Sequence, residues 1–296
     1  MQLKKMLPWT TLVLGLLCGL LRGLDLARGY DQVTGLPTGA LWEPVLIVCL
    51  AAACVVLFLL ARSYPGSSPK EKAFETYFTG AGDLYKTVSV LCAAVLALSG
   101  AAGLYFTLTG ANTPKQSEVA VLAGTVNPLF DLIAQIPLWI LAIVTAVVFI
   151  RMAGVAARGF ISEEQAGLTI VPVFWSAFDL ILTFKDNSGT PMLGHYVFEL
   201  LAAGLLTLSF YYYAGFLFAK PHPARFAFCA SMASCLALTS AVGVGVAVLL
   251  GVDYLPGALL RQACFVAAAA WPLSQLVLMA KGRAPSDAAP AQPAQG

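Results

Sequence analysis

The residues of this sequence best suited to chemistry are three ionisable side chains within or beside long apolar stretches. Asp179 lies in one stretch, Glu199 lies in the next, and His195 precedes Glu199 by four positions, which places these two on one helical face. Ionisable residues inside a bilayer are costly and usually mark a functional site. Two carboxylates that bind a cation or a proton, tuned by the protonation of a histidine, are therefore the predicted solute- or proton-binding site.

The two carboxylates are predicted to lie at a similar depth. Asp179 comes about five residues before the outer end of its stretch, and Glu199 about five residues after the outer start of the next. At a rise of ~1.5 Å per residue, both would lie roughly 7–8 Å below the helix ends. Because the two stretches form a short hairpin, we expect His195 to meet both of them.

Four further charged residues are predicted at the same level, as a supporting polar cluster. Glu43 and Asp131 open two other apolar stretches, Arg22 leaves the first and Arg261 enters the last. For Glu43, Asp131 and Arg22 the favoured interpretation is structural, because a carboxylate in a first helical turn is stabilised by free N–H groups and an arginine can extend to the interface. If the two central carboxylates form a binding site, Arg261 or Arg22 is predicted to serve as its counter-ion. For the two central carboxylates, a functional role and a structural polar contact remain alternatives.

Other chemistry is not indicated. Asp179, His195 and Glu199 would leave an open position on a divalent cation, but so sparse a pattern is weak, and we predict no metal site. The sequence contains no G-x-x-x-x-G-K-[ST], H-E-x-x-H or G-x-S-x-G motif. We therefore predict no catalytic residue and no cofactor. The seven cysteines lie in apolar stretches without C-x-x-C spacing, which is typical of small buried side chains.

The elements that must position these residues are membrane-spanning helices. Of the 296 residues, 59% are hydrophobic and only 11% are charged, whereas a soluble domain has about 25% charged residues. The mean hydropathy is +0.82. The net charge of +2 is too small and too scattered to predict nucleic acid as a partner. The composition predicts an integral membrane protein whose first partner is the lipid bilayer.

Eight stretches have the length of about 20 mostly apolar residues that a spanning helix needs. They predict an all-α bundle forming a single domain over residues 1–281, followed by a disordered cytoplasmic tail over 282–296. Seven spans are the alternative, because the fifth stretch is short and contains an aspartate. The predicted spans are 7–24, 41–61, 87–109, 129–153, 168–184, 194–219, 226–251 and 257–280.

The loops predict the orientation and one surface helix. With the N-terminus inside, twelve Lys and Arg residues fall in cytoplasmic loops and five in outer loops, in keeping with the excess of positive charge on the cytoplasmic side. Both termini are therefore predicted to be cytoplasmic, in a cell membrane taken to be the bacterial cytoplasmic membrane. In the longest cytoplasmic loop, Phe74, Tyr77 and Phe78 predict a short helix on the membrane surface.

Small residues at every fourth position predict close helix packing on two spans. Packing within the chain is the favoured interpretation, and docking of another membrane protein on the glycine-rich face is the alternative. The two stripes are Gly15, Gly19 and Gly23 on the first span, and Ala237, Ala241 and Gly245 on the seventh.

Together these observations predict a carrier or permeation protein for a small solute or cation, with its polar site in the outer half of the membrane. The alternative is a non-catalytic subunit, assembly factor or sensor, in which the polar cluster only ties helix ends together. A membrane enzyme that uses the carboxylates as acid and base ranks last, because no motif supports it.

Overall fold

The computed structural model describes residues 2–30, 38, 41–65, 73–78, 82–110, 128–158, 163–187, 196–218, 220–254 and 256–281; within these ranges the side chains of 2, 73, 128–132, 163, 164 and 187 lie outside the description. Within these described ranges, eight helices are long and apolar enough to cross a membrane, and two short helices accompany them. The long helices are α1 (Gln2–Arg28), α2 (Trp42–Ala61), α4 (Asp83–Leu108), α6 (Pro128–Arg158), α8 (Ile170–Asn187), α9 (Val197–Leu217), α10 (Pro223–Leu249) and α11 (Pro256–Lys281), and the short ones are α3 (Ala73–Phe78) and α7 (Glu163–Leu168).

The predicted all-α fold with eight spanning helices is confirmed. The fifth span, which contains Asp179, has a mean hydropathy of 1.7 over its most apolar segment and is helical except at Thr169, where α7 gives way to α8. The largest differences from the predicted boundaries are at α1, which begins five residues earlier at Gln2, and at α6, which continues five residues further to Arg158. The predicted tail over 282–296 lies outside the described residues.

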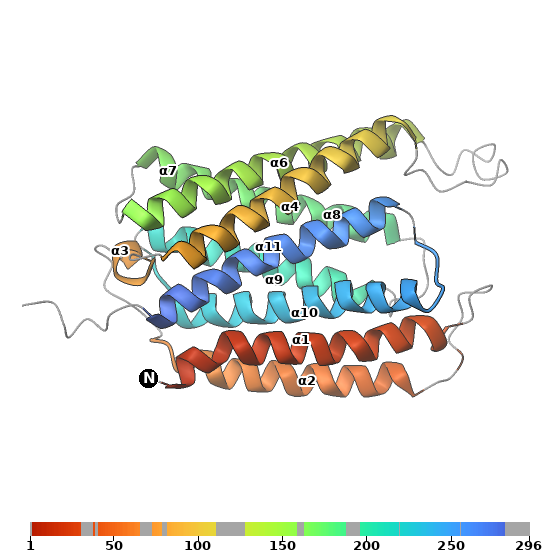
Figure 1. The fold of residues 1–296 in the computed structure, drawn as a ribbon, viewed down its shortest axis with the longest axis horizontal. Helices are drawn as coiled ribbons and strands as arrows, with labels where there is room; N and C mark the ends of the chain where they lie inside the picture. Colours follow the sequence, from red (N-terminus) through yellow and green to blue (C-terminus); the bar gives the residue numbers. More distant parts are fainter. Residues whose placement is uncertain are drawn as a thin grey trace, which may run out of the picture.

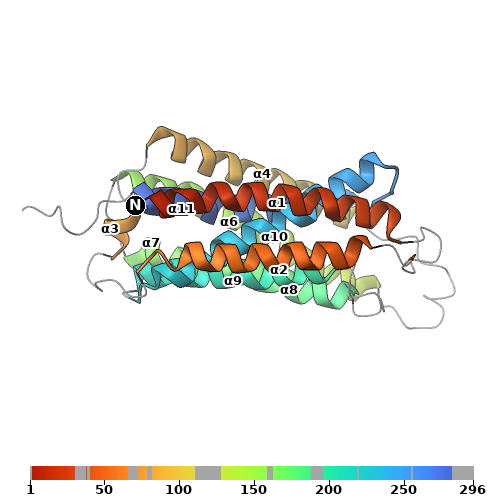
Figure 2. The ribbon, with the colours of Figure 1, turned by 90° about the horizontal axis from the view of Figure 1, so that it is seen from below.

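The long helices run roughly along one axis, so that α1 begins and α11 ends at the same end of the bundle (Figure 1). We call this the terminal end, and the opposite one, where α1 ends and α11 begins, the cavity end. The pair α1 and α2 lies on one side and the pair α4 and α6 on the other, and the turned view agrees (Figure 2). Helices α10 and α11 lie between the two pairs. In the most apolar 18-residue segment of each helix, 61% of α10 and 72% of α11 is buried, compared with 28% of α2.

The glycine stripe of α1 packs against α10. A Cβ atom added at any of its three glycines would come within 2.9 Å or less of a Cβ atom of α10, so only glycine allows the two backbones to approach this closely. This contact confirms packing within the chain. It buries the glycine-rich face that the sequence left as a possible docking surface for another membrane protein. The facing pairs are Gly15 with Leu238, Gly19 with Val242 and Gly23 with Val246.

The second stripe of small residues behaves differently. Ala237 is buried, but a Cβ atom added at Gly245 would meet no heavy atom of the described chain within 4 Å. The expectation that this stripe packs a helix over its whole length is therefore wrong at Gly245, which faces open space on the side of the bundle.

The terminal end is closed by a cluster of buried aromatic side chains. The expectation that α3 lies on the membrane surface is wrong, because Phe74 and Phe78 are 3% and 0% exposed and pack on rings of α9 and α10. The cluster continues inward to Trp271, whose ring stacks on Phe149 with centroids 4.4 Å apart. We use the name aromatic cluster for the following eight side chains: Phe74, Phe78, Phe149, Phe210, Tyr213, Phe216, Phe226 and Trp271.

Candidate functional site

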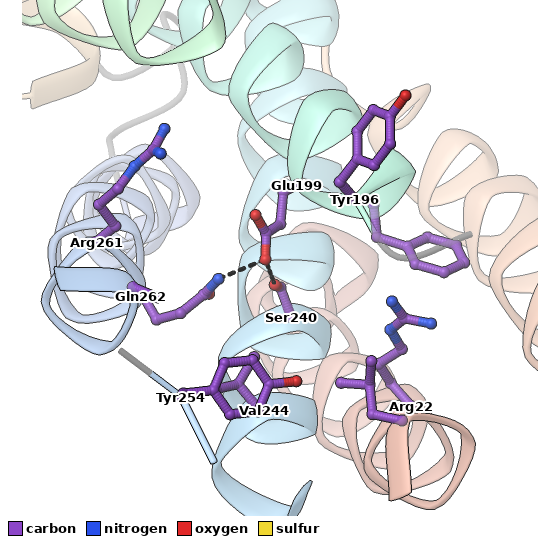
Figure 3. Close-up of a pocket in the computed structure, with 11 residues that line it drawn as sticks. Arg22, Tyr196, Glu199, Ser240, Val244, Tyr254, Arg261 and Gln262 are labelled. Carbon is purple, nitrogen blue, oxygen red and sulfur yellow. Dashed lines mark hydrogen bonds between the residues drawn. The ribbon is translucent and has the colours of Figure 1, made fainter. Parts of the chain in front are cut away.

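A cavity of about 260 Å³ opens between α1, α9, α10 and α11 near the cavity end of the bundle (Figure 3). Its lining combines the charged side chains Arg22, Glu199 and Arg261 with the aromatic side chains Tyr196, Phe198 and Tyr254. We call it the polar cavity. The tight contact of α1 with α10 fixes one wall, because both helices carry lining residues beside their glycine contact.

Glu199 lies at the centre of the polar cavity and is partly buried. Its Oε1 atom accepts a hydrogen bond of 2.6 Å from Nε2 of Gln262 and one of 3.2 Å from Oγ of Ser240 (Figure 3). No described cation lies within ion-pair distance of Glu199, and no described hydrogen bond reaches its second oxygen. One oxygen is thus held in place by two neutral side chains, and no described side chain binds the other.

Asp179 is held differently. Its carboxylate is 2% exposed, and its Oδ1 atom accepts hydrogen bonds from Nη2 and Nε of Arg261 at 2.9 and 3.2 Å. The same guanidinium donates to Thr183 Oγ1 at 2.6 Å and pairs with Asp186 at 3.0 Å. This network ties α8 to α11. The guanidinium makes no ion pair with Glu199, although it is close enough to act on that carboxylate electrostatically, and Arg261 also lines the polar cavity (Figure 3).

A second buried ion pair lies on the α1 side. Nη1 of Arg22 is 2.5 Å from Oδ2 of Asp25, and the two side chains are 3% and 1% exposed. The guanidinium also lies 4.9 Å from the ring centroid of Phe198, a cation–π contact. Gly243 makes room for this arrangement, since a Cβ atom there would lie 2.6 Å from Cγ of Arg22.

Asp179 and Glu199 do not bond to each other in the described structure, although both contact the same helix. They are bound by consecutive residues of α11, Arg261 and Gln262. The expected position of Glu199 more than a turn inside its helix is wrong, because α9 begins at Val197 and Glu199 belongs to its first turn. The free N–H groups of that turn favour its negative charge.

The other predicted residues do not complete this arrangement. His195 lies outside the described residues, and so does the side chain of Asp131, although α6 includes its backbone. Glu43 occupies the first turn of α2, does not line the polar cavity, and is close enough to Asp25 to act on it electrostatically. Arg22 and Arg261 do line the cavity.

Sequence reasoning missed the neutral residues that position the carboxylate. Ser240 and Gln262 bind Glu199, but an isolated serine or glutamine in an apolar stretch gives no sign of what it faces. Asp25 was missed because the first span was predicted to stop at residue 24. Its spacing of three from Arg22 was the available signal, since that spacing puts both side chains on one helical face.

The described ion pairs and the lining of the polar cavity include two arginines and four carboxylates, a formal charge of −2 for this set of described residues; its members are Arg22, Arg261, Asp25, Asp179, Asp186 and Glu199. Burial raises the pKa of the Tyr254 phenol, which lies between the spans α10 and α11, so this wall of the cavity remains a neutral hydrogen-bonding group.

Within the described part of the chain, no three His, Cys, Asp or Glu side chains converge as a metal ion would require. Comparison of this chain with known protein families, with curated proteins and with solved structures finds no match. The functional interpretation therefore rests on the geometry of the polar cavity.

Proposed function

We propose that this multi-pass membrane protein is a carrier for a small organic cation, which it binds at Glu199 in the polar cavity. The observation that carries the proposal is how this one carboxylate is bound: the neutral side chains of Ser240 and Gln262 bind one of its oxygens, and no described hydrogen bond or ion pair reaches the other. A partly buried carboxylate without a cation is costly in a membrane, and a bound cation relieves that cost.

The cavity favours an organic cation over a bare metal ion. A volume of about 260 Å³ is large for one ion, and one free carboxylate supplies too few ligands for one. Rings of Tyr196, Phe198 and Tyr254 form part of the walls, and aromatic faces stabilise ammonium groups. The formal charge of −2 on the surrounding group acts in the same direction.

The two ends of the bundle support a carrier that alternates between two forms. The polar cavity lies near one end, and the buried aromatic cluster fills the other. In this proposal the present form binds from the cavity end, which faces outside in the orientation predicted from the loop charges. Release inside requires the helices around the aromatic cluster to separate, with α3 as the shortest element to displace.

A thermal-shift titration of the detergent-solubilised protein tests the binding step. Ethylamine is expected to raise the unfolding temperature with concentration, whereas ethanol and acetate leave it unchanged, since ligands that bind only the folded state stabilise it by mass action. Glu199→Gln keeps the shape and both accepted hydrogen bonds but removes the charge, so it should abolish the ethylamine effect. Uptake of labelled ethylamine into proteoliposomes tests the transport step.

Glu43→Gln is the matched control, because Glu43 is another carboxylate in a first helical turn at the cavity end that does not line the polar cavity. It should respond to ethylamine as the wild type does. Stabilisation by acetate instead of ethylamine, or an unchanged ethylamine response in Glu199→Gln, would overturn the binding site. Binding without uptake would overturn the carrier and leave a receptor or sensor.

A further inference from the structure

A second hollow, on the side of the bundle, adjoins the polar cavity. It is a groove of about 490 Å³ between α4, α10 and α11, which we call the lateral groove. Leu91 and Val95 of α4 form one wall and are 59% and 41% exposed. Gly245 of α10 borders the open space, and no heavy atom of the described chain lies within 4 Å of where its Cβ would be.

The groove is apolar along its length except at one point. Along α11 it extends from Leu259 to Ala270, which is about 16 Å at ~1.5 Å per residue. Of the residues that line it, only Gln262 carries a side-chain nitrogen or oxygen. A groove on the flank of a spanning bundle is bounded by lipid hydrocarbon, so an aliphatic chain suits this lining.

Gln262 joins the two hollows. It lines both the lateral groove and the polar cavity, as does Val244. Its Nε2 atom donates to Glu199 across 2.6 Å. The apolar groove therefore leads, within the length of one side chain, to the carboxylate that lacks a cation.

We propose that the organic cation is an amphiphile: its ammonium group binds at Glu199, and its hydrocarbon chain lies in the lateral groove, which it enters from the bilayer. This inference rests on the proposed function and names the class of ligand for the same site. The chain gains little hydrophobic free energy on leaving lipid for the groove. The groove instead aligns the chain so that the ammonium group arrives at the depth of Glu199.

The test compares ethylamine with octylamine on protein in lipid nanodiscs. The measured quantity is the apparent dissociation constant of ethylamine divided by that of octylamine. This ratio, the octylamine advantage, is compared between the wild type and Gly245→Phe. The phenyl ring would occupy open space in the groove, so the variant should fold and keep its affinity for ethylamine. We expect the octylamine advantage to fall roughly tenfold in Gly245→Phe, which is equivalent to about 1.4 kcal/mol. Gly245→Leu, which adds less volume, should lose part of it.

Gly204→Phe on α9 is the matched control, because a Cβ atom at Gly204 also meets no described heavy atom within 4 Å, and Gly204 lines neither hollow. Partition of octylamine into lipid is common to all variants and cancels in the comparison. An octylamine advantage that survives Gly245→Phe, or is absent from the wild type, overturns the amphiphile and leaves the cation site intact. If the wild type does not bind ethylamine, both the cation site and the amphiphile are overturned.

Discussion

The two ends of the bundle are built from different kinds of side chain, aromatic at one end and charged or polar at the other. At the terminal end, eight aromatic side chains that are 3% exposed or less pack ring against ring. At the cavity end, the Asp179–Arg261 ion pair connects α8 with α11, the Glu199–Gln262 hydrogen bond connects α9 with α11, and a cavity of about 260 Å³ remains between the helices. The same eight helices thus form a filled end and a hollow one.

This difference separates residues that hold the fold from residues available for binding. In lipid, helices gain little from hydrophobic association, so packing of complementary surfaces stabilises them, and the aromatic cluster provides such packing. At the cavity end the Asp179–Arg261 ion pair does this structural work, while only neutral side chains bind Glu199. Variants at the two ends should therefore differ in kind as well as in size.

The largest expected effect is at the terminal end. Trp271→Ala removes a ring that stacks on Phe149 and contacts Tyr213 edge-on, and it leaves a void that neighbours in close-packed helices cannot refill. We expect the free energy of unfolding to fall by about 3–5 kcal/mol, measured by denaturant titration in mild detergent. Trp9→Ala is the control, because Trp9 is 72% exposed and should change little. If Trp271→Ala and Trp9→Ala lower the free energy of unfolding equally, packing of the aromatic cluster is not what stabilises the terminal end.

The next effect sharpens the comparison within the cavity end. Arg261→Leu strands the carboxylate of Asp179, which is 2% exposed, without its cation. A buried charge left unpaired costs about 3 kcal/mol or more, so the same titration should show a marked loss of stability. The double variant Asp179→Asn with Arg261→Leu removes both charges and should recover much of that loss. If it recovers none, the pair is not the source of the stability.

The sequence was sufficient to predict the spanning helices, because about 20 apolar residues in a row have few structural alternatives in a membrane. It also indicated that Asp179 and Glu199 are exceptional. It did not distinguish their roles, since those depend on which residue of α11 each carboxylate faces. Arg261 and Gln262 are neighbours in sequence, yet one binds Asp179 and the other binds Glu199.

Small residues show a similar limit. The stripe Gly15, Gly19 and Gly23 and the stripe Ala237, Ala241 and Gly245 have the same spacing, and both predict helix packing. Only the first is covered along its length, whereas Gly245 faces the lateral groove. Spacing defines a face of a helix, but the path of the neighbouring helices decides whether that face is filled. Likewise, the aromatic residues of α3 suit a membrane surface and a buried plug equally well.

The smallest effect on stability is expected at Glu199. In Glu199→Gln the amide oxygen can accept the same hydrogen bonds from Ser240 and Gln262, and no described ion pair is broken. We expect the free energy of unfolding to change by less than about 1 kcal/mol, while ethylamine stabilisation disappears. A loss as large as that of Arg261→Leu would place Glu199 among the structural residues and remove the contrast within the cavity end. A carboxylate that can be neutralised without harm to the fold is one whose charge serves a ligand.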